Sequence, residues 1–229
     1  MVHHVANFTN AFSAWENWNL TDFESKSECL LSLKASLQNP LHAAVVGFHL
    51  QQAEQLLSFT HQLVGPTGET NELYTAGRGV TVIAADVVSE QAQLAIVAQC
   101  TAALIAGNSV IVCSDDSEFT QNFEAAYQQS SLPTNLMHFA SFEALNQVLE
   151  SDVRAVGFIG SSEGERSLNR QLAARDGAIV ALVSETDLAT QTVAHDPHLS
   201  LRFITERTRT INITAVGGNA TLLGAVDSD

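Results

Sequence analysis

The spacing of apolar residues changes near residue 65 and again near residue 188. From about residue 9 to residue 64, apolar residues recur every three or four positions, which is the period of helices with one buried face. We predict helices on both sides of the break at Asn39-Pro40, the last of them running from Leu41 to Leu63. The aromatic stripe of the first helix is predicted to face the core: Phe12, Trp15 and Trp18. The turn-rich run 65–72 ends this part.

From Gly79 onward, short apolar runs alternate with helical patterns. The predicted strands cover 80–85, 109–114, 136–140, 153–160 and 178–185, and the helices between them cover 89–107, 117–131, 141–151 and 161–175. The strands are rich in Val, Ile and Ala without strict polar alternation, as a sheet buried on both faces requires. The fold class is therefore α/β: a Rossmann-like, mostly parallel five-stranded sheet with helices on both faces.

The last forty residues follow a third pattern. Apolar and polar residues alternate across a Thr-rich run from about residue 201 to 216, and Gly217-Gly218-Asn219 is typical of a turn, which predicts an antiparallel hairpin outside the main sheet. The chain is thus divided into a helical N-terminal segment over 1–75, a Rossmann-like domain over 76–188 and a C-terminal β-flap over 189–229.

Composition excludes several classes of function. The 25 acidic residues outnumber the 10 basic ones, giving a formal net charge of −15, so we expect no nucleic-acid partner and no binding to an anionic membrane. The apolar runs are too short to span a bilayer. Three widely spaced cysteines without a CxxC pair fit a reducing cytoplasm, and the eight histidines have no recognised metal-ligand spacing, so no metal is expected.

The run GFIGSSEGERS (157–167) carries the candidate binding chemistry. In a nucleotide-binding βαβ unit, the turn after the strand directs backbone N–H groups at a phosphate, and small residues allow close approach. Gly160, Ser161 and Ser162 lie at the corresponding place and are the candidate cofactor-binding residues. The spacing is not GxGxxG, however, and is equally typical of a turn that only caps a helix.

The same stretch carries a resemblance to a known family. GFIGSSEGERSLNRQLAARDGAIVALVSET (157–186) resembles the aldehyde dehydrogenase superfamily, and GPTGETNELYTAGRGV (65–80) and AALIAGNSVIV (102–112) resemble the stretch that precedes that unit. It is most similar to the Δ1-pyrroline-5-carboxylate dehydrogenase half of the bifunctional proline utilization A enzymes, whose C-terminal tail resembles TRTINITAVGGNATLL (208–223). The resemblance implies NAD at the 160–162 turn and makes Glu185 the counterpart of the family's catalytic glutamate.

Most of the family's reactive groups are replaced. The resemblance places the nucleophilic cysteine in a catalytic domain after Glu185, but no cysteine follows Cys113 and that domain is expected to be missing. The oxyanion-stabilising Asn falls on Glu90, and the ribose-binding Lys-Pro-x-Glu element reads Cys113-Ser114-Asp115-Asp116, without the lysine. Cys29 and Cys100 lie in predicted helices. We therefore predict a non-catalytic protein in which Glu185 is vestigial and no cofactor is required, although NAD stays open.

The tail indicates a structural role. Some proline utilization A proteins contain an inactive aldehyde dehydrogenase-like domain whose tail serves as an oligomerisation flap, and this chain resembles that domain. We predict a homodimer, or a complex with a proline-catabolic enzyme, through the flap residues Thr208, Thr210, Ile211, Ile213, Gly217, Gly218 and Asn219. The alternatives are an NAD-binding regulatory module and a genuine Δ1-pyrroline-5-carboxylate dehydrogenase acting with a partner.

Overall fold

The computed structural model describes residues 2–65 and 68–212; residues 1, 66–67 and 213–229 lie outside the description. The chain forms two compact units, one of residues 1–58 with 76–205 and one of residues 59–75 with 206–229. One division between these units, after residue 75, falls at a predicted boundary, whereas the N-terminal helices and residues 189–205 belong to the same unit as the parallel sheet. No helix in the described ranges is long and apolar enough to cross a membrane.

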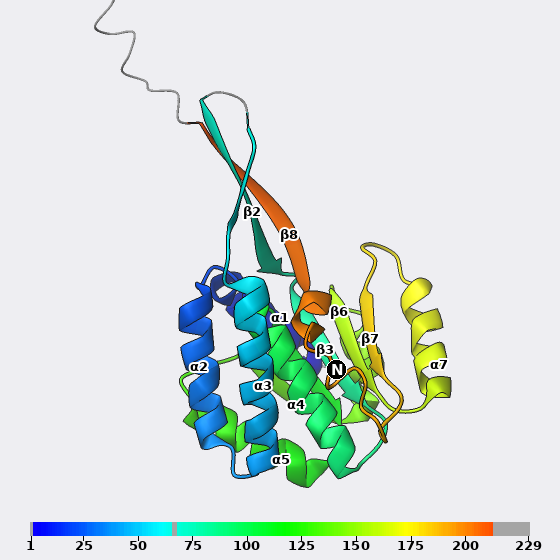
Figure 1. Ribbon diagram of the computed structural model, residues 1–229. Coiled ribbons are helices and arrows are strands. Elements are labelled where there is room, and N and C mark those ends of the chain that lie inside the picture. Colours follow the sequence, from blue (N-terminus) through cyan, green and yellow to red (C-terminus); the bar gives the residue numbers. More distant parts are fainter. Residues whose placement is uncertain (1, 66–67, 213–229) are drawn as a thin grey trace, which may run out of the picture. The chain divides into compact units, whose positions relative to one another are not determined.

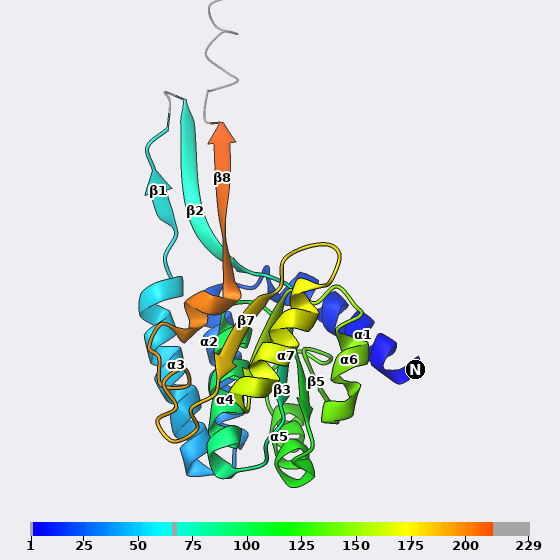
Figure 2. The same ribbon diagram turned by 90° about the vertical axis from the view of Figure 1, so that its right-hand side faces the viewer.

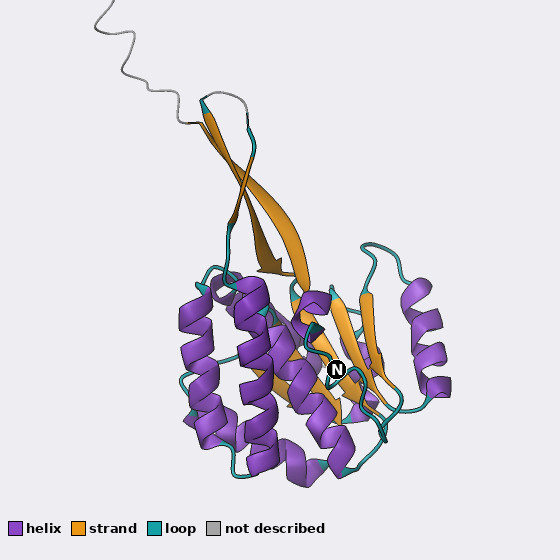
Figure 3. Cartoon of the chain, in the orientation of Figure 1, coloured by secondary structure: helices purple, strands orange, loops and turns teal. Residues whose placement is uncertain are grey.

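The first unit is built on a five-stranded parallel sheet with the order β5-β4-β3-β6-β7. The strands are β3 (Val80–Ala85), β4 (Ser109–Ser114), β5 (Met137–Ala140), β6 (Ala155–Ile159) and β7 (Ala181–Glu185). Every residue of β3, β4 and β6 is buried, which confirms the predicted two-sided burial. Figure 3 shows helices on both sides of these strands. The order along the sheet reverses between β3 and β6, so this pair is the topological switch point.

Connecting helices cover the sheet on two faces. The helices α4 (Glu90–Ile105) and α5 (Ser117–Gln129) pack on one face. The short 3₁₀ helix η1 (Phe142–Ala144), α6 (Leu145–Val148) and α7 (Ser162–Ala173) pack on the other. Ser89 is the N-cap of α4: its Oγ accepts from the backbone N–H of Ala92 at 3.1 Å, which satisfies an otherwise unpaired donor.

The N-terminal helices complete both layers. The helices α2 (Phe23–Ser36) and α3 (Pro40–Leu57) pack over α4, as Figure 1 shows, and α1 (Val2–Trp18) contacts β4, β3 and α6. Trp18 is buried, as predicted, and its indole N–H donates to the carbonyl of Leu104 at 2.8 Å. The predicted end of the third helix at Leu63 is wrong. The helix α3 ends at Leu57, because residues 61–63 form a strand of the second unit instead.

The second unit contains a three-stranded sheet with the order β1-β2-β8 (Figure 2). Its strands are β1 (His61–Leu63), β2 (Glu69–Gly77) and β8 (Ile204–Asn212), and β1 pairs antiparallel with β2. The predicted strand in the tail is confirmed as β8, and its neighbour among the described residues is β2; the predicted turn at Gly217-Gly218-Asn219 and the strand after it lie outside the described residues. The prediction of a turn-rich boundary over 65–72 was therefore wrong from Glu69, where β2 begins.

Side-chain bonds join β8 to β2. The Arg209 guanidinium donates to Glu72 Oε2 through Nε at 2.9 Å, and its carbon lies 5.8 Å from the centre of the Tyr74 ring. Thr210 Oγ1 donates to Asn71 Oδ1 at 2.6 Å. Both bonds are exposed to solvent, so each is expected to contribute little to stability.

Candidate functional site

The predicted turn lies at the switch point of the sheet. The strand β6 ends at Ile159, and Gly160 and Ser161 lead into α7. The register pairs Ala85 of β3 with Ile159, so the next residue of each strand, Asp86 and Gly160, lie side by side. Ligands of parallel α/β sheets bind outside the carboxyl ends of the strands at such a point. The structure therefore places Gly160, Ser161 and Ser162 at the carboxyl end of β6, beside the switch point of the parallel sheet.

Several N–H groups of this turn are used by the protein itself. The Gly160 N–H donates to the backbone carbonyl of Glu185 at 3.1 Å. The Gly164 N–H donates to Ser161 Oγ at 3.1 Å, which makes Ser161 the N-cap of α7. The Ser161 N–H forms a hydrogen bond with the Asp86 carboxylate. A phosphate in this turn would have to compete for these donors.

Asp86 is a residue of the site that sequence reasoning missed. A Cβ built on Gly160 would lie 1.8 Å from Asp86 Oδ1, and one built on Gly164 would lie 2.6 Å from Oδ2. The carboxylate thus occupies the space that the two glycines leave open. Partial burial raises the pKa of Asp86, and the hydrogen bond from Ser161 acts in the opposite direction. The only sequence signal was an acidic residue directly after a buried strand.

A cavity of about 300 Å³ adjoins this turn. It lies on the side of the sheet that carries α6 and α7, and Asp86 forms part of its lining. Its apolar walls come from Phe142, Leu145, Phe158 and Leu168. The site therefore combines an apolar space for a ring-sized group with a negatively charged edge.

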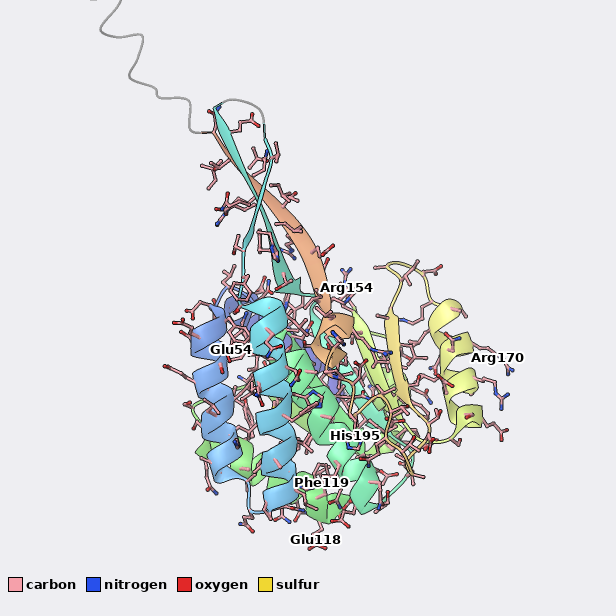
Figure 4. All side chains as sticks on the ribbon, in the orientation of Figure 1. Glu54, Glu118, Phe119, Arg154, Arg170 and His195 are labelled. Atoms are coloured by element: carbon pink, nitrogen blue, oxygen red, sulfur yellow. The ribbon has the colours of Figure 1, made fainter. Side chains whose placement is uncertain are left out.

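Glu185, the predicted vestigial catalytic residue, is a buried structural residue. It is 1% exposed, and its Oε2 accepts from the backbone N–H groups of Val193 at 2.7 Å and Ala194 at 3.0 Å. Its Oε1 accepts from the Asp187 N–H at 3.3 Å. These bonds fix the loop that follows β7, which contains His195 (Figure 4). A carboxylate held this way is not positioned to accept a proton from a substrate.

Two of the three cysteine thiols, those of Cys100 and Cys113, lie in environments that suppress reactivity. Cys100 on α4 and Cys113 on β4 are buried. Burial raises the pKa of Cys100 far above its usual range and, together with the charge of Asp115, raises that of Cys113 to about 12. Cys29 on α2 is partly buried. Since the thiolate is the nucleophile, Cys100 and Cys113 are inert near neutral pH.

The resemblance also singled out Asp115, Asp116 and Glu90, and the first two of these form local structural hydrogen bonds. Asp116 caps α5 by accepting from the Phe119 N–H at 3.1 Å and also accepts from Gln93 Nε2 at 2.8 Å. Asp115 accepts from the Phe142 N–H at 2.9 Å. Glu90 is exposed in the first turn of α4. No cluster of His, Cys, Asp and Glu within 2–65 and 68–212 is arranged to hold a metal ion.

The predicted flap residues fall partly on β8. Thr208, Thr210 and Ile211 lie on this strand and are exposed, and Ile211 is 41% exposed. Ile213, Gly217, Gly218 and Asn219 lie outside the described residues.

The chain is similar in sequence and structure to proline utilization A proteins. No family model matches the chain. The bifunctional protein PutA of Escherichia coli (strain K12) is 28% identical over 205 residues, which is 83% of this chain and 14% of that protein. A mutant of proline utilization A from Bradyrhizobium japonicum is 27% identical with a TM-score of 0.71, and the match covers 80% of this chain and 22% of that chain. The chain has the aldehyde dehydrogenase-like fold of proline utilization A.

A third comparison extends the fold beyond proline utilization A. The 1-pyrroline-5-carboxylate dehydrogenase from Thermus, solved with bound NAD, has a TM-score of 0.66 at 18% identity, covering 81% of this chain and 42% of that chain. This chain spans less than a quarter of the length of the proline utilization A proteins that it matches. The similarity therefore concerns one domain-sized part of those proteins.

Proposed function

We propose that the chain is a non-catalytic, aldehyde dehydrogenase-like module that associates with another protein chain through the β1-β2-β8 sheet, called the flap below. The observation that carries the non-catalytic part is the Glu185 carboxylate, whose two oxygens accept three backbone hydrogen bonds inside the protein. The inert thiols of Cys100 and Cys113 support it, because thioester chemistry needs a thiolate.

The flap has features of an association surface. Among the described residues, β8 is a terminal strand of its sheet, and the edge of such a strand can accept a further strand. Three apolar side chains of the flap are exposed: Leu63 by 42%, Ile211 by 41% and Val64 completely. An exposed edge and exposed apolar side chains are both covered when a second chain adds to the sheet.

Charge favours a second copy of this chain as the partner. The protein has a net charge of −15, yet two of its ten basic residues, Arg207 and Arg209, are exposed on β8. Arg209 is already paired with Glu72, so Arg207 is the cation of β8 that is left to meet the acidic surface of another copy. A proline-catabolic enzyme, the other partner predicted from the resemblance, is a separate outcome of the test below.

The association is tested by measuring mass in solution by light scattering at micromolar concentration. We expect a dimer for the wild-type chain and a monomer for the triple variant Leu63→Ser, Val64→Ser, Ile211→Ser. Added salt is expected to dissociate the wild-type dimer into monomers as well. The variant Ile179→Ser is the matched control, because Ile179 is 95% exposed but belongs to the first unit, and it is expected to stay dimeric.

Two other results would decide against self-association. A wild-type monomer that binds neither itself nor a proline-catabolic enzyme contradicts the proposal. If the wild-type chain is a monomer that binds such an enzyme, and the triple variant does not bind it, the partner of the flap is the enzyme and not a second copy of this chain.

A second candidate is an NAD-binding regulatory module. It is supported by the cavity beside the switch point and by the Thermus neighbour with bound NAD. Asp86 argues against it, because its carboxylate fills the turn where the pyrophosphate would lie.

A cytoplasmic location, supported by three free cysteines, is part of the proposal of a non-catalytic module.

A further inference from the structure

We propose that a second cavity, between α3, α4 and α5, is a binding site for a small organic ammonium ion, with Asp116 as the carboxylate that receives the positive charge. The cavity has a volume of about 440 Å³, within the range of small-molecule pockets. It lies on the face of the parallel sheet that carries α4 and α5, whereas the cavity beside the 160–162 turn lies on the other face. The inference is independent of association through the flap.

The Asp116 carboxylate is buried without a cation. It is 8% exposed, and its Oδ1 accepts from the Phe119 N–H at 3.1 Å while its Oδ2 accepts from Gln93 Nε2 at 2.8 Å. Each carboxylate oxygen can accept a second hydrogen bond. Within 2–65 and 68–212, none of the Lys, Arg and His side chains forms an ion pair with Asp116. Since buried charges are normally paired, a cation in the cavity that Asp116 lines would complete the environment of its carboxylate.

Glu185 is a buried carboxylate of the opposite kind. Its two oxygens accept three backbone hydrogen bonds, and it lines neither the 440 Å³ cavity nor the 300 Å³ cavity. Asp116 has only one backbone donor and one side-chain donor, and it faces open space. The protein itself therefore satisfies Glu185, whereas Asp116 keeps acceptor capacity for a ligand.

A chain of side-chain hydrogen bonds along the wall of the cavity ends on Asp116. Asn39 Nδ2 lies 3.4 Å from His42 Nε2, and an amide nitrogen only donates, so the ring proton of His42 is on Nδ1. His42 also bonds to the Gln93 side chain, whose Nε2 donates to Asp116. Burial lowers the pKa of His42, while Glu90 and the bond with Gln93 act in the opposite direction. The ring is therefore neutral near neutral pH and adds no positive charge to the cavity.

The charges around the cavity favour a cation. Asp116 and Glu118 line it, and Glu90 lies in the first turn of α4. The N-termini of α3, α4 and α5 oppose these carboxylates, but each helix end is equivalent to only about half a positive charge. None of the described lining residues is Lys or Arg. The full negative charges outweigh the partial positive ones, so the cavity attracts a cation and repels a phosphate or a carboxylate.

The lining favours an organic cation over a metal ion. No group of His, Cys, Asp and Glu side chains in the described ranges could hold a metal ion. Leu37, Phe119 and Phe123 supply apolar surface, and the Phe119 ring meets the His42 ring edge-on with 5.4 Å between the ring centres (Figure 4). An ammonium group on an apolar stem matches a carboxylate beside such surface, and aromatic rings attract cations as well.

The experiment titrates the isotope-labelled full chain with n-butylammonium, 1-butanol and butyrate, and follows the amide chemical shifts by NMR. We expect n-butylammonium to bind about tenfold more tightly than the other two probes and to shift the amides of Gln93 and Phe119, because only the cation forms a charge-assisted hydrogen bond with Asp116. Asp116→Asn is expected to lower the affinity for n-butylammonium about tenfold and to leave that for 1-butanol unchanged. Asn caps helices as well as Asp does, so this variant stays folded, which its thermal unfolding checks.

Asp22→Asn is the matched control, because Asp22 is the exposed N-cap aspartate of α2 and lies outside the lining. It is expected to leave the affinity for n-butylammonium unchanged; an equal loss in this variant would show a general effect of the net charge and overturn the proposal. Equal wild-type affinities for n-butylammonium and 1-butanol would overturn it too, as would an Asp116→Asn chain that binds n-butylammonium as tightly as the wild type. Tighter binding of butyrate would show that the helix N-termini dominate, which also contradicts the assigned ligand class.

Discussion

Replacing Trp18 with alanine is expected to lower the free energy of unfolding by about 3–5 kcal/mol. The side chain is 2% exposed and packs in the core between the N-terminal helices and α4. Its indole N–H donates to the Leu104 carbonyl at 2.8 Å, close to the end of α4. The substitution removes both the packing and the donor, and leaves a cavity that the surrounding helices cannot fill. Urea unfolding followed by circular dichroism measures the change.

Trp15 provides the matched control for Trp18. It lies one turn earlier on α1 and is only partly buried, and its indole nitrogen has no hydrogen-bond partner. Trp15→Ala is expected to cost less than half as much as Trp18→Ala. Trp18→Phe, which keeps a ring but loses the donor, should cost about 1–3 kcal/mol. Equal effects at the two tryptophans would show that α1 is not anchored through Trp18.

Replacing Glu185 with alanine is expected to lower the free energy of unfolding by about 3 kcal/mol. The substitution leaves the N–H groups of Asp187, Val193 and Ala194 without their acceptor. Glu185→Gln keeps one carbonyl oxygen for Val193 and Ala194, so we expect a cost of about 1–2 kcal/mol. Thermal unfolding of the variants beside the wild-type chain gives the ranking.

Glu124→Gln is the control for Glu185, because Glu124 is an exposed glutamate on α5 and should change stability by less than about 0.5 kcal/mol. If Glu185 were instead kept for proton transfer, Glu185→Gln would leave stability unchanged and abolish an activity. Such a result would contradict the structural role derived for Glu185.

The parallel sheet could be predicted because each of its signals is local. The run 80–85 is apolar throughout, and Ser89 begins the next helix with a recognisable cap. The neighbour of β8 could not be predicted in the same way. Arg209 bonds to Glu72, 137 positions earlier in the sequence, and β2 itself consists mostly of polar residues. Nothing in the local pattern of the tail indicates a partner that distant.

The candidate site was predictable in place but not in chemistry. The turn 160–162 follows from the strand-turn-helix pattern, but the position of the Asp86 carboxylate depends on the register that pairs Ala85 with Ile159. Register between strands seventy residues apart is a tertiary property. The role of Glu185 was hidden for the same reason, since its acceptor oxygens are satisfied by a loop whose conformation only the fold defines.

We propose that the chain keeps the aldehyde dehydrogenase-like fold without the reaction. The most direct measurement is the formation of NADH from NAD⁺ and Δ1-pyrroline-5-carboxylate by the purified chain, with the variants Cys29→Ser, Cys100→Ser and Cys113→Ser assayed in parallel. We expect no NADH above the rate without protein, because Cys100 and Cys113 are inert thiols and Glu185 is committed to its loop. NADH formation that one of the three cysteine substitutions abolishes would contradict the account.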